Sequence, residues 1–282
     1  MDIDHLREWL GKTESTDDQV TATPIAALSA TLNREHAAPH AGDPLPPLWH
    51  WLYFLPIHRQ DQLGPDGHPL RGGFLPPVPL PRRMWAGSRL RFHHPLRNGE
   101  PISRLSRIAD VSYKEGRSGP LVFVLVRHEI GNAAGVAISE EHDIVYRDNP
   151  HPDDPPPKIQ MAPSDAAWSR RIEPDDVLLF RYSALTFNGH RIHYDRRYVT
   201  EVEGYPGLVV HGPLIATLLM DLLGRNLPAV TVATFQFRAV KPLFDTAPFS
   251  VCGKPEADGK TVRLWAMDAQ GALTMDATAT LA

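Results

Sequence analysis

The sequence predicts an α+β fold in which two antiparallel sheets are each wrapped around a long helix. Three observations support this prediction: strand-like runs on both sides of a proline-rich segment at 148–157, one similar turn sequence on each side of it, and an apolar helix after it. The proline-rich segment cannot continue a helix or a central strand. We therefore divide the chain into an N-terminal half, 1–148, and a C-terminal half, 158–282.

The composition is typical of a folded protein and excludes several partners. The 282 residues, 42% hydrophobic and 22% charged, suffice for two domains with real cores. A net charge of −4 gives no attraction for nucleic acid or an anionic membrane, and no apolar run is long enough to span one. The single Cys252 excludes an internal disulfide, and the N-terminus lacks a secretory signal. We expect a cytoplasmic protein.

Strand-like runs recur in the same order in both halves. They lie at 88–94, 101–113, 120–130 and 136–147, and again at 176–185, 230–241, 247–254 and 261–281. The segments 95–102 and 242–249 both read P-L-x-[N/D]-x-x-P-apolar and join two runs. The alternative is that the two segments are unrelated turns, since turns in general favour proline, asparagine and aspartate. The matching order around both copies favours a duplication.

A long helix is predicted at 211–224. Pro213 lies near its start and Gly224 at its end, and the segment is apolar on nearly all sides, so we expect it to be buried. The segment 47–55 is also apolar on all sides and is the candidate counterpart in the first half. A buried helix against a curled antiparallel sheet is the hot-dog arrangement. The chain is therefore predicted to be a double hot dog.

The densest group of polar residues lies at 185–195 and reads L-T-F-N-G-H-R-I-H-Y-D. Asn188 and His193 could bind one water, which the amide orients and the imidazole deprotonates. Gly212, at the start of the buried helix, could offer its backbone N–H to a thioester enolate. A base, a water and an oxyanion site are what hydration of a conjugated thioester needs.

These residues resemble the motif of the MaoC-like hydratases, the type 2 enoyl-CoA hydratase group. That motif reads G-D-x-N-P-x-H and is followed by H-G at the start of the central helix. Residues 187–193 fill the first part, and His211 and Gly212 fill the second. The resemblance implies His193 as the catalytic histidine, Asn188 in the place of the catalytic aspartate, and Gly212 as the oxyanion donor. Because an amide cannot accept a proton, His193 is left as the sole base.

The sequence of this motif resembles the form found in one subgroup of the family. That subgroup includes type 2 hydroxyacyl-thioester dehydratases and bacterial itaconyl-CoA and mesaconyl-C4-CoA hydratases. A stretch like 80–87 also occurs in that subgroup. The resemblance implies a hydro-lyase that converts itaconyl-CoA or mesaconyl-C4-CoA to citramalyl-CoA. It needs no cofactor, because the thioester is the electron sink. The first half would shape the tunnel for the acyl group or CoA, and a homodimer is one assembly that the resemblance allows.

A small diacid carries a second carboxylate, which must meet a cation when it is buried. Arginine suits a carboxylate because its donors form a fork. Arg191 lies inside the motif, and Arg82 and Arg83 lie in the stretch shared with the subgroup, although that pair could also be solvated. His190 completes the substrate-binding candidates, with Trp85 as tunnel lining.

Other interpretations stay open. His193 could be an ordinary turn histidine, and His190, His193 and Asp195 could bind a metal, although no further cluster supports a zinc site and none is predicted. His211 is expected to satisfy backbone groups at the helix start. The alternative functions are a dehydratase of longer 3-hydroxyacyl thioesters in lipid synthesis, a thioesterase, for which Asn188 lacks the required carboxylate, and a non-catalytic acyl-CoA-binding protein.

Overall fold

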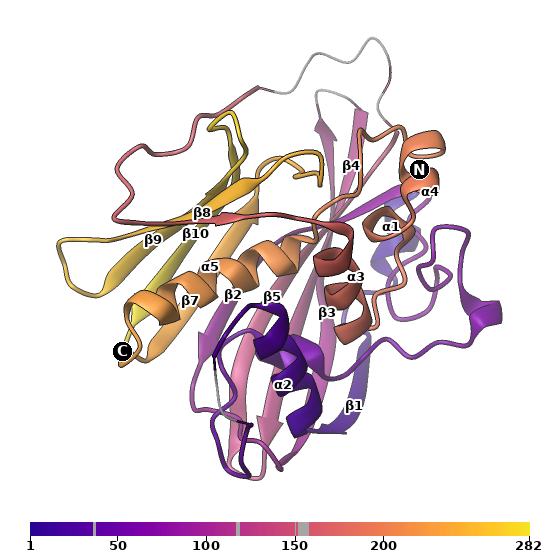
Figure 1. The fold of residues 1–282 in the computed structure, drawn as a ribbon. Helices are drawn as coiled ribbons and strands as arrows, with labels where there is room; N and C mark the ends of the chain where they lie inside the picture. The colour runs from indigo at the N-terminus through magenta and orange to yellow at the C-terminus, as the bar shows by residue number, and fades with distance from the viewer. Residues whose placement is uncertain (36–37, 117–118, 150, 152–157) are drawn as a thin grey trace.

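The computed structural model describes residues 1–35, 38–116, 119–149, 151 and 158–282. Within these residues, ten strands form one antiparallel sheet in the order β1-β3-β4-β5-β2-β7-β10-β9-β8-β6. The strands of the N-terminal half fill one side of the sheet and those of the C-terminal half the other (Figure 1). Most of the predicted boundary at 148–157 lies outside the described residues.

The N-terminal half contributes five strands. Those at 82–147 match the predicted runs, whereas the edge strand at 13–19, T-E-S-T-D-D-Q, was not predicted because it has no apolar residue. A polar edge strand resists pairing with another molecule. The elements are α1 (Ile3–Arg7), β1 (Thr13–Gln19), α2 (Ala22–Thr31), η1 (Trp49–Leu52), η2 (Gln60–Gln62), β2 (Arg82–Phe92), β3 (Pro101–Gly116), β4 (Gly119–Asn132) and β5 (Gly135–Arg147).

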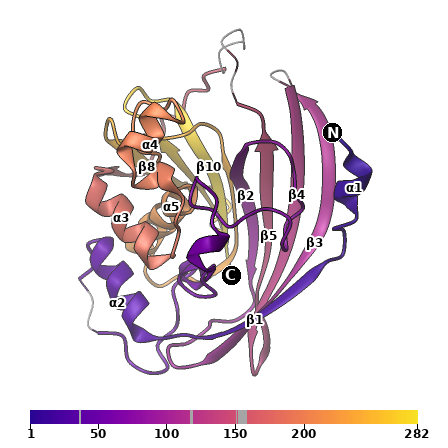
Figure 2. The same ribbon diagram turned by 90° about the vertical axis from the view of Figure 1, so that its right-hand side faces the viewer.

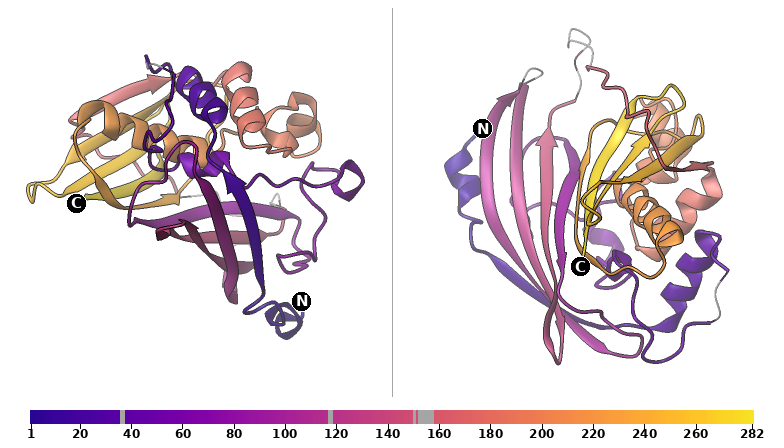
Figure 3. Two further views of the ribbon diagram at one scale, coloured as in Figure 1. Left: turned by 90° about the horizontal axis from the view of Figure 1, so that it is seen from below. Right: turned by 90° about the vertical axis from the view of Figure 1, so that its left-hand side faces the viewer.

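The C-terminal half contributes the other five strands and the longest helix. Its elements are β6 (Trp168–Ile172), α3 (Asp176–Leu185), η3 (Arg191–His193), α4 (Arg196–Glu201), α5 (Gly212–Asn226), β7 (Val232–Ala239), β8 (Phe249–Pro255), β9 (Thr261–Met267) and β10 (Leu273–Leu281). Helices α2, α3, α4 and α5 lie on the same side of the curved sheet (Figure 2). Helix α1 instead contacts β3 from the outer side (Figure 3). None of the described helices is both long and apolar enough to cross a membrane.

The strand predicted at 176–185 is wrong, because this segment forms α3. The Asp175 side chain caps the helix by accepting a hydrogen bond from the backbone N–H of Leu178 (2.8 Å). The buried side chains are Leu179, Tyr182 and Ser183, which is helical spacing. The cap and the spacing outweigh the apolar character of the run.

Strands β2 and β7 join the two halves, in a register that runs from Gly87 opposite Arg238 to Arg91 opposite Thr234. Gly87 allows this approach, because a Cβ there would lie 2.4 Å from the carbonyl oxygen of Phe237. The structure therefore differs from the two separate sheets that were predicted. Pairing of these strands removes two sheet edges that separate halves would expose.

Helix α5 is the predicted long helix, and all ten residues from 214 to 223 are buried. It contacts β6, β8, β9 and β10 and so fills the C-terminal half of the curved sheet. The prediction of a matching helix at 47–55 is wrong, since only the single turn η1 forms there. Leu48 (φ 72°) and Phe54 (φ 56°) have left-handed backbones on either side of η1, so the chain turns before a helix can extend.

A buried carboxylate fixes η1 against the sheet. Glu140 on β5 accepts hydrogen bonds from Trp51 Nε1 (3.2 Å) and Ser88 Oγ (3.1 Å), and it lies 3.2 Å from His50 Nε2. Burial alone would raise the pKa of Glu140, but the hydrogen bond and charge of His50 lower it to about 2. Polar side chains thus occupy part of the space that a helix fills in the other half.

A second buried carboxylate holds α5 in place. Asp221 accepts hydrogen bonds from Arg170 Nη1 (2.6 Å) on β6, from Arg225 Nε (2.7 Å) within α5, and from Arg34, which follows α2. The Asp221 side chain is fully buried, and the three guanidinium groups are only partly exposed. This cluster ties both halves to the central helix.

Replacing Asp221 with Ala should lower the free energy of unfolding by about 3–5 kcal/mol, because three partly buried arginines lose their partner. Urea denaturation followed by circular dichroism measures this change. Asp61→Ala, which removes an exposed carboxylate beside Arg59, is the control and should change stability by less than about 0.5 kcal/mol. Equal stability of the two variants would contradict the role of Asp221.

Candidate functional site

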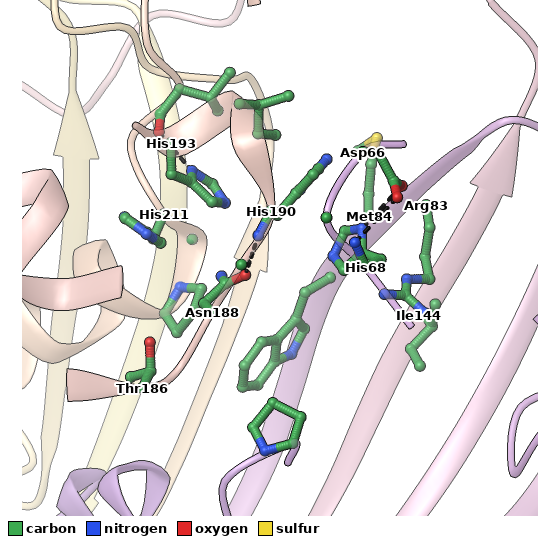
Figure 4. Close-up of a pocket in the computed structure, with 18 of the residues that line it drawn as sticks. Asp66, His68, Arg83, Met84, Ile144, Thr186, Asn188, His190, His193 and His211 are labelled. Atoms are coloured by element: carbon green, nitrogen blue, oxygen red, sulfur yellow. Dashed lines mark hydrogen bonds and ion pairs between the residues drawn. The ribbon is translucent and has the colours of Figure 1, made fainter. Parts of the chain in front are cut away.

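A cavity of about 2260 Å³ lies between the two halves. Its walls include Arg83 and Trp85 from β2, the loop 64–68, the segment 188–193, and Gly212 at the start of α5 (Figure 4). Sites for ordinary small molecules measure roughly 300–1000 Å³. The cavity therefore has room for a much larger ligand.

The predicted polar segment follows the end of α3. Phe187 (φ 49°) adopts a left-handed backbone there, which turns the chain out of the helix. The backbone N–H of Asn188 then donates to the carbonyl of Ser183 (2.8 Å), and Tyr194 Oη donates to the carbonyl of Gly189 (2.9 Å). The segment thus forms a compact turn that brings its side chains to the cavity.

His193 is held in one tautomer. Its Nδ1 lies 2.7 Å from the backbone carbonyl of Val209. Because a carbonyl only accepts, Nδ1 carries the proton and Nε2 is left as an acceptor. Burial lowers the pKa of His193 to about 4, so the ring is neutral at neutral pH. A neutral imidazole with a free Nε2 at a cavity is suited to be a general base.

His211 supports the ring of His193 from behind. The two rings are stacked at 3.7 Å with an angle of 18° between their planes. His211 Nε2 lies 2.8 Å from Ser183 Oγ, and the side chain makes no hydrogen bond that caps α5. The expectation that His211 satisfies backbone groups at the helix start is therefore wrong. Its partners are His193 and Ser183.

Asn188 and Gly212 lie on the same cavity wall as His193. The amide oxygen of Asn188 accepts a hydrogen bond from the backbone N–H of His190 (3.0 Å), so its amide nitrogen is left to donate. Gly212 begins α5, and a backbone hydrogen bond at the start of this helix runs from Ile215 N to His211 O (3.1 Å). The N–H of Gly212 lies before the first turn is closed and is therefore one of the unpaired groups at the helix start. Their roles with a water and an oxyanion stay predictions.

Two of the three predicted arginines are engaged with the protein itself. Arg191 donates from Nε (3.0 Å) and Nη2 (2.7 Å) to Asp195, which also caps α4. Arg82 donates to Asn149 Oδ1 (2.9 Å) and to the backbone carbonyl of Glu203 (3.0 Å). Both guanidinium groups hold loops in place.

Arg83 has a different environment. It lines the cavity beside Tyr146 and His68, on the wall that also carries Ile144 (Figure 4). Within the described part of the chain, Arg83 forms no ion pair. Arg83 is thus the predicted arginine that is available to an anion in the cavity.

Trp85, two residues after Arg83, donates from Nε1 to Ser88 Oγ (2.9 Å), and its ring packs on Trp51 at 5.0 Å.

The loop 64–68 of the N-terminal half also belongs to the site, which the sequence did not reveal. A Cβ on Gly67 would lie 1.9 Å from the carbonyl oxygen of Gly189, so the two backbones are in direct contact. Arg191 donates from its backbone N–H to Asp66 O (2.9 Å) and from Nη1 to Pro65 O (2.9 Å). G-P-D-G-H-P indicates a turn, but no local pattern places it against the motif.

This loop brings a group of possible metal ligands together. One ligand atom each from Asp66, His68 and His190 lies within 4.8 Å of the other two. The alternative metal set proposed from the sequence, His190, His193 and Asp195, does not assemble, because the Asp195 carboxylate pairs with Arg191. The ring of His190 instead lies 3.9 Å from that of His68, tilted by 38°, and meets the edge of His193 at 5.4 Å.

Comparison with known proteins identifies the family. Residues 48–245 match hydroxyacyl-thioester dehydratase type 2. The chain belongs to that family. It is also 50% identical to the mesaconyl-C(4)-CoA hydratase of Chloroflexus aurantiacus, over 97% of this chain and 96% of that one. The predicted resemblance is thereby confirmed, and the family match includes both the loop 64–68 and the motif at 188–193.

Solved structures show the fold of this dehydratase-family chain. A MaoC-like dehydratase from Phytophthora capsici superimposes with a TM-score of 0.69 at 10% identity, covering 100% of this chain and 98% of that one. A Mycobacterium tuberculosis protein described as having a double hot-dog fold gives a TM-score of 0.59 at 14% identity, with 97% and 96% covered. The predicted hot-dog fold is confirmed.

Histidines around the cavity should make the protein less stable in acid. Burial lowers the pKa from 6.5 to about 4 for His128, about 3 for His142 and about 4 for His193. The unfolded chain therefore binds these protons first as the pH falls below about 6.5, and each histidine should cost up to about 1.4 kcal/mol per pH unit until its folded pKa is reached. The lowered pKa of Glu140 affects the free energy of unfolding only below about pH 4.5, where this carboxylate binds a proton in the unfolded chain.

Urea midpoints between pH 7.5 and pH 5 measure this dependence. His142→Phe should flatten it by removing one titrating group, whereas His40→Ala, which removes an exposed side chain, should leave it unchanged. A midpoint that is constant over this range in the wild-type protein would contradict the neutral state of the buried histidines.

Proposed function

We propose that the protein is a hydro-lyase that reversibly adds water to the double bond of a short α,β-unsaturated acyl-CoA. The observation that carries the proposal is the state of His193, a neutral imidazole whose Nδ1 donates to Val209 and whose Nε2 is free at the cavity. The 50% identity to a mesaconyl-C(4)-CoA hydratase supports the same reaction.

The geometry suggests how the groups divide the work. The thioester carbonyl would accept a hydrogen bond from the N–H of Gly212, where the start of α5 favours negative charge. Asn188 would donate from its amide nitrogen to a water, and His193 Nε2 would take a proton from it. The water oxygen then bonds to the β-carbon, the π electrons move onto the thioester oxygen, and the enolate gains a proton at the α-carbon.

The proposed substrate is the thioester of a small diacid, with itaconyl-CoA or mesaconyl-C4-CoA giving citramalyl-CoA. Arg83 supports this choice, because it lines the cavity and has no ion-pair partner among the described residues. Burial of a second substrate carboxylate would be costly without such a cation. Arg82 and Arg191 would contribute indirectly, through the loops that they hold.

The N-terminal half is proposed to form the tunnel for the acyl group and CoA. Its described residues form no helix as long as α5, and its sheet lines the cavity with Arg104, His128 and His142. Under this proposal 1–148 and 158–282 are a degenerate and a catalytic hot-dog unit. The cytoplasmic location, the homodimer and the absence of a cofactor stay predictions.

Dehydration of longer 3-hydroxyacyl thioesters is a second candidate function. The match to hydroxyacyl-thioester dehydratase type 2 and the cavity of about 2260 Å³ favour it. The same residues would catalyse it, because the reaction is reversible. Comparison of mesaconyl-C4-CoA, itaconyl-CoA, crotonyl-CoA and longer enoyl-CoAs, followed by loss of the enoyl absorbance, distinguishes the two candidates.

His193→Ala should lower kcat by roughly 10²–10⁴-fold, because the reaction loses its general base. Kinetics on the best thioester of the wild-type enzyme measure the change, and circular dichroism verifies that the variant is folded. His40→Ala, at an exposed position, should keep the wild-type rate. Near-normal turnover of a folded His193→Ala variant would assign the base to another residue.

Arg83→Met should reduce the preference for mesaconyl-C4-CoA over crotonyl-CoA by about 2–5 kcal/mol, the range for removing one member of a buried charge pair. The ratio of kcat/KM values for the two thioesters measures it. Arg91→Met, on the exposed part of the same strand, is the matched control and should not change the ratio. If wild-type enzyme prefers crotonyl-CoA or longer enoyl-CoAs, the diacid assignment is wrong.

A further inference from the structure

A carboxylate and an imidazole from the N-terminal half face the motif of the C-terminal half. Asp66 Oδ2 accepts from His68 Nδ1 (3.1 Å), and Asp66 Oδ1 accepts from the His68 backbone N–H (3.0 Å). Because an ionised carboxylate only accepts, His68 Nδ1 carries a proton and its Nε2 is free.

His68 thus has the same arrangement as His193. In each imidazole, Nδ1 donates to a fixed oxygen of the protein, and Nε2 is left for a ligand. The other ring nearby, His190, has no side-chain hydrogen bond within the described residues to fix its tautomer. An oriented imidazole is the usual form of a proton-transferring histidine.

The position of His68 relative to the motif is rigidly determined. Contact between the backbones of Gly67 and Gly189 and the hydrogen bond from Arg191 N to Asp66 O fix the loop. The His68 ring contacts that of His190 at a centroid distance of 3.9 Å, and His190 meets His193 edge to face. Figure 4 shows His68 and His193 on opposite sides of His190, both beside the cavity.

The proposed reaction needs a second proton transfer, for which the C-terminal half offers His190, a ring without a hydrogen bond among the described residues that would fix its tautomer. Water must lose a proton as it bonds to the β-carbon, and the α-carbon must gain one. Asn188 carries no titratable proton, and His211 Nε2 is engaged with Ser183. Two imidazoles that face the cavity from different halves could instead serve the two carbons.

We propose that His68, oriented by Asp66, is a second acid–base residue that exchanges a proton with the substrate α-carbon, while His193 exchanges one with water. This inference rests on the proposed hydro-lyase function. In hydration, protonated His68 gives its Nε2 proton to the α-carbon as His193 Nε2 takes one from water. In dehydration, neutral His68 removes the α-proton, the C–O bond breaks, and protonated His193 gives a proton to the departing hydroxide.

Exchange of the α-proton of citramalyl-CoA and 3-hydroxybutyryl-CoA in D₂O tests the division of roles. Mass spectrometry follows deuterium uptake, and absorbance follows dehydration. We expect His193→Ala to lower dehydration by roughly 10²–10⁴-fold but retain exchange, and His68→Asn to lower exchange at least about 100-fold, as loss of a general base does. Asp66→Asn should lower exchange in the same direction, whereas Asp61→Asn, an exposed carboxylate near the same loop, should match wild type.

Imidazole rescue separates catalysis by His68 from a structural role. Free imidazole added to His68→Ala should restore exchange in proportion to its concentration, because the cavity can admit it. Full exchange by a folded His68→Asn variant, or no rescue of His68→Ala, would overturn the proposal for His68 alone. A wild-type enzyme that dehydrates neither thioester would overturn the proposed function itself.

Chelation tests the competing use of the same side chains. Enzyme treated with EDTA should keep its full rate. If activity were lost and then restored by Zn²⁺, Asp66, His68 and His190 would be metal ligands, and the proton-transfer proposal would be wrong.

Discussion

The pairing of β2 with β7 is the constraint on which the rest of the structure depends. These strands make one sheet from two halves, and Gly87 is required at their crossing because any side chain would meet the Phe237 carbonyl. The pairing also sets the start of α5 against β2, since a Cβ on Gly212 would lie 4.0 Å from the carbonyl oxygen of Trp85. The cavity, the start of α5 and the arginines of β2 therefore share one frame.

The two halves use this frame differently. In the C-terminal half, α5 fills the curve of the sheet with apolar side chains and is anchored by Asp221. In the N-terminal half, one short turn and the buried Glu140 occupy that place, and the remaining space is open. Burial of a carboxylate is unfavourable unless it is well bonded. Its three hydrogen-bonding partners explain how a polar interior is tolerated there.

Local sequence predicted the parts of the fold that local interactions determine. Helix α5 could be predicted because Pro213 marks its start and its apolar residues are continuous, although it runs past Gly224, the predicted end, to Asn226. Helix α3 was mistaken for a strand, although Asp175 provided a capping signal. Arg191 was assigned to the substrate, although Asp195 follows at the i+4 spacing typical of a helical ion pair. The loop 64–68 could not be placed, because two glycines far apart in the sequence bring it to the motif.

Among its described residues the first half has no helix as long as α5, and this has a consequence for how such a chain can evolve. In a dimer of identical units, each substitution appears twice, so a change that enlarges one binding space also removes packing around the other helix. A single chain with two halves is free of this coupling. Residues of η1 that line the cavity can change while α5 and its anchor at Asp221 stay as they are. The shape of the cavity and the stability of the C-terminal half are thereby inherited as separate traits.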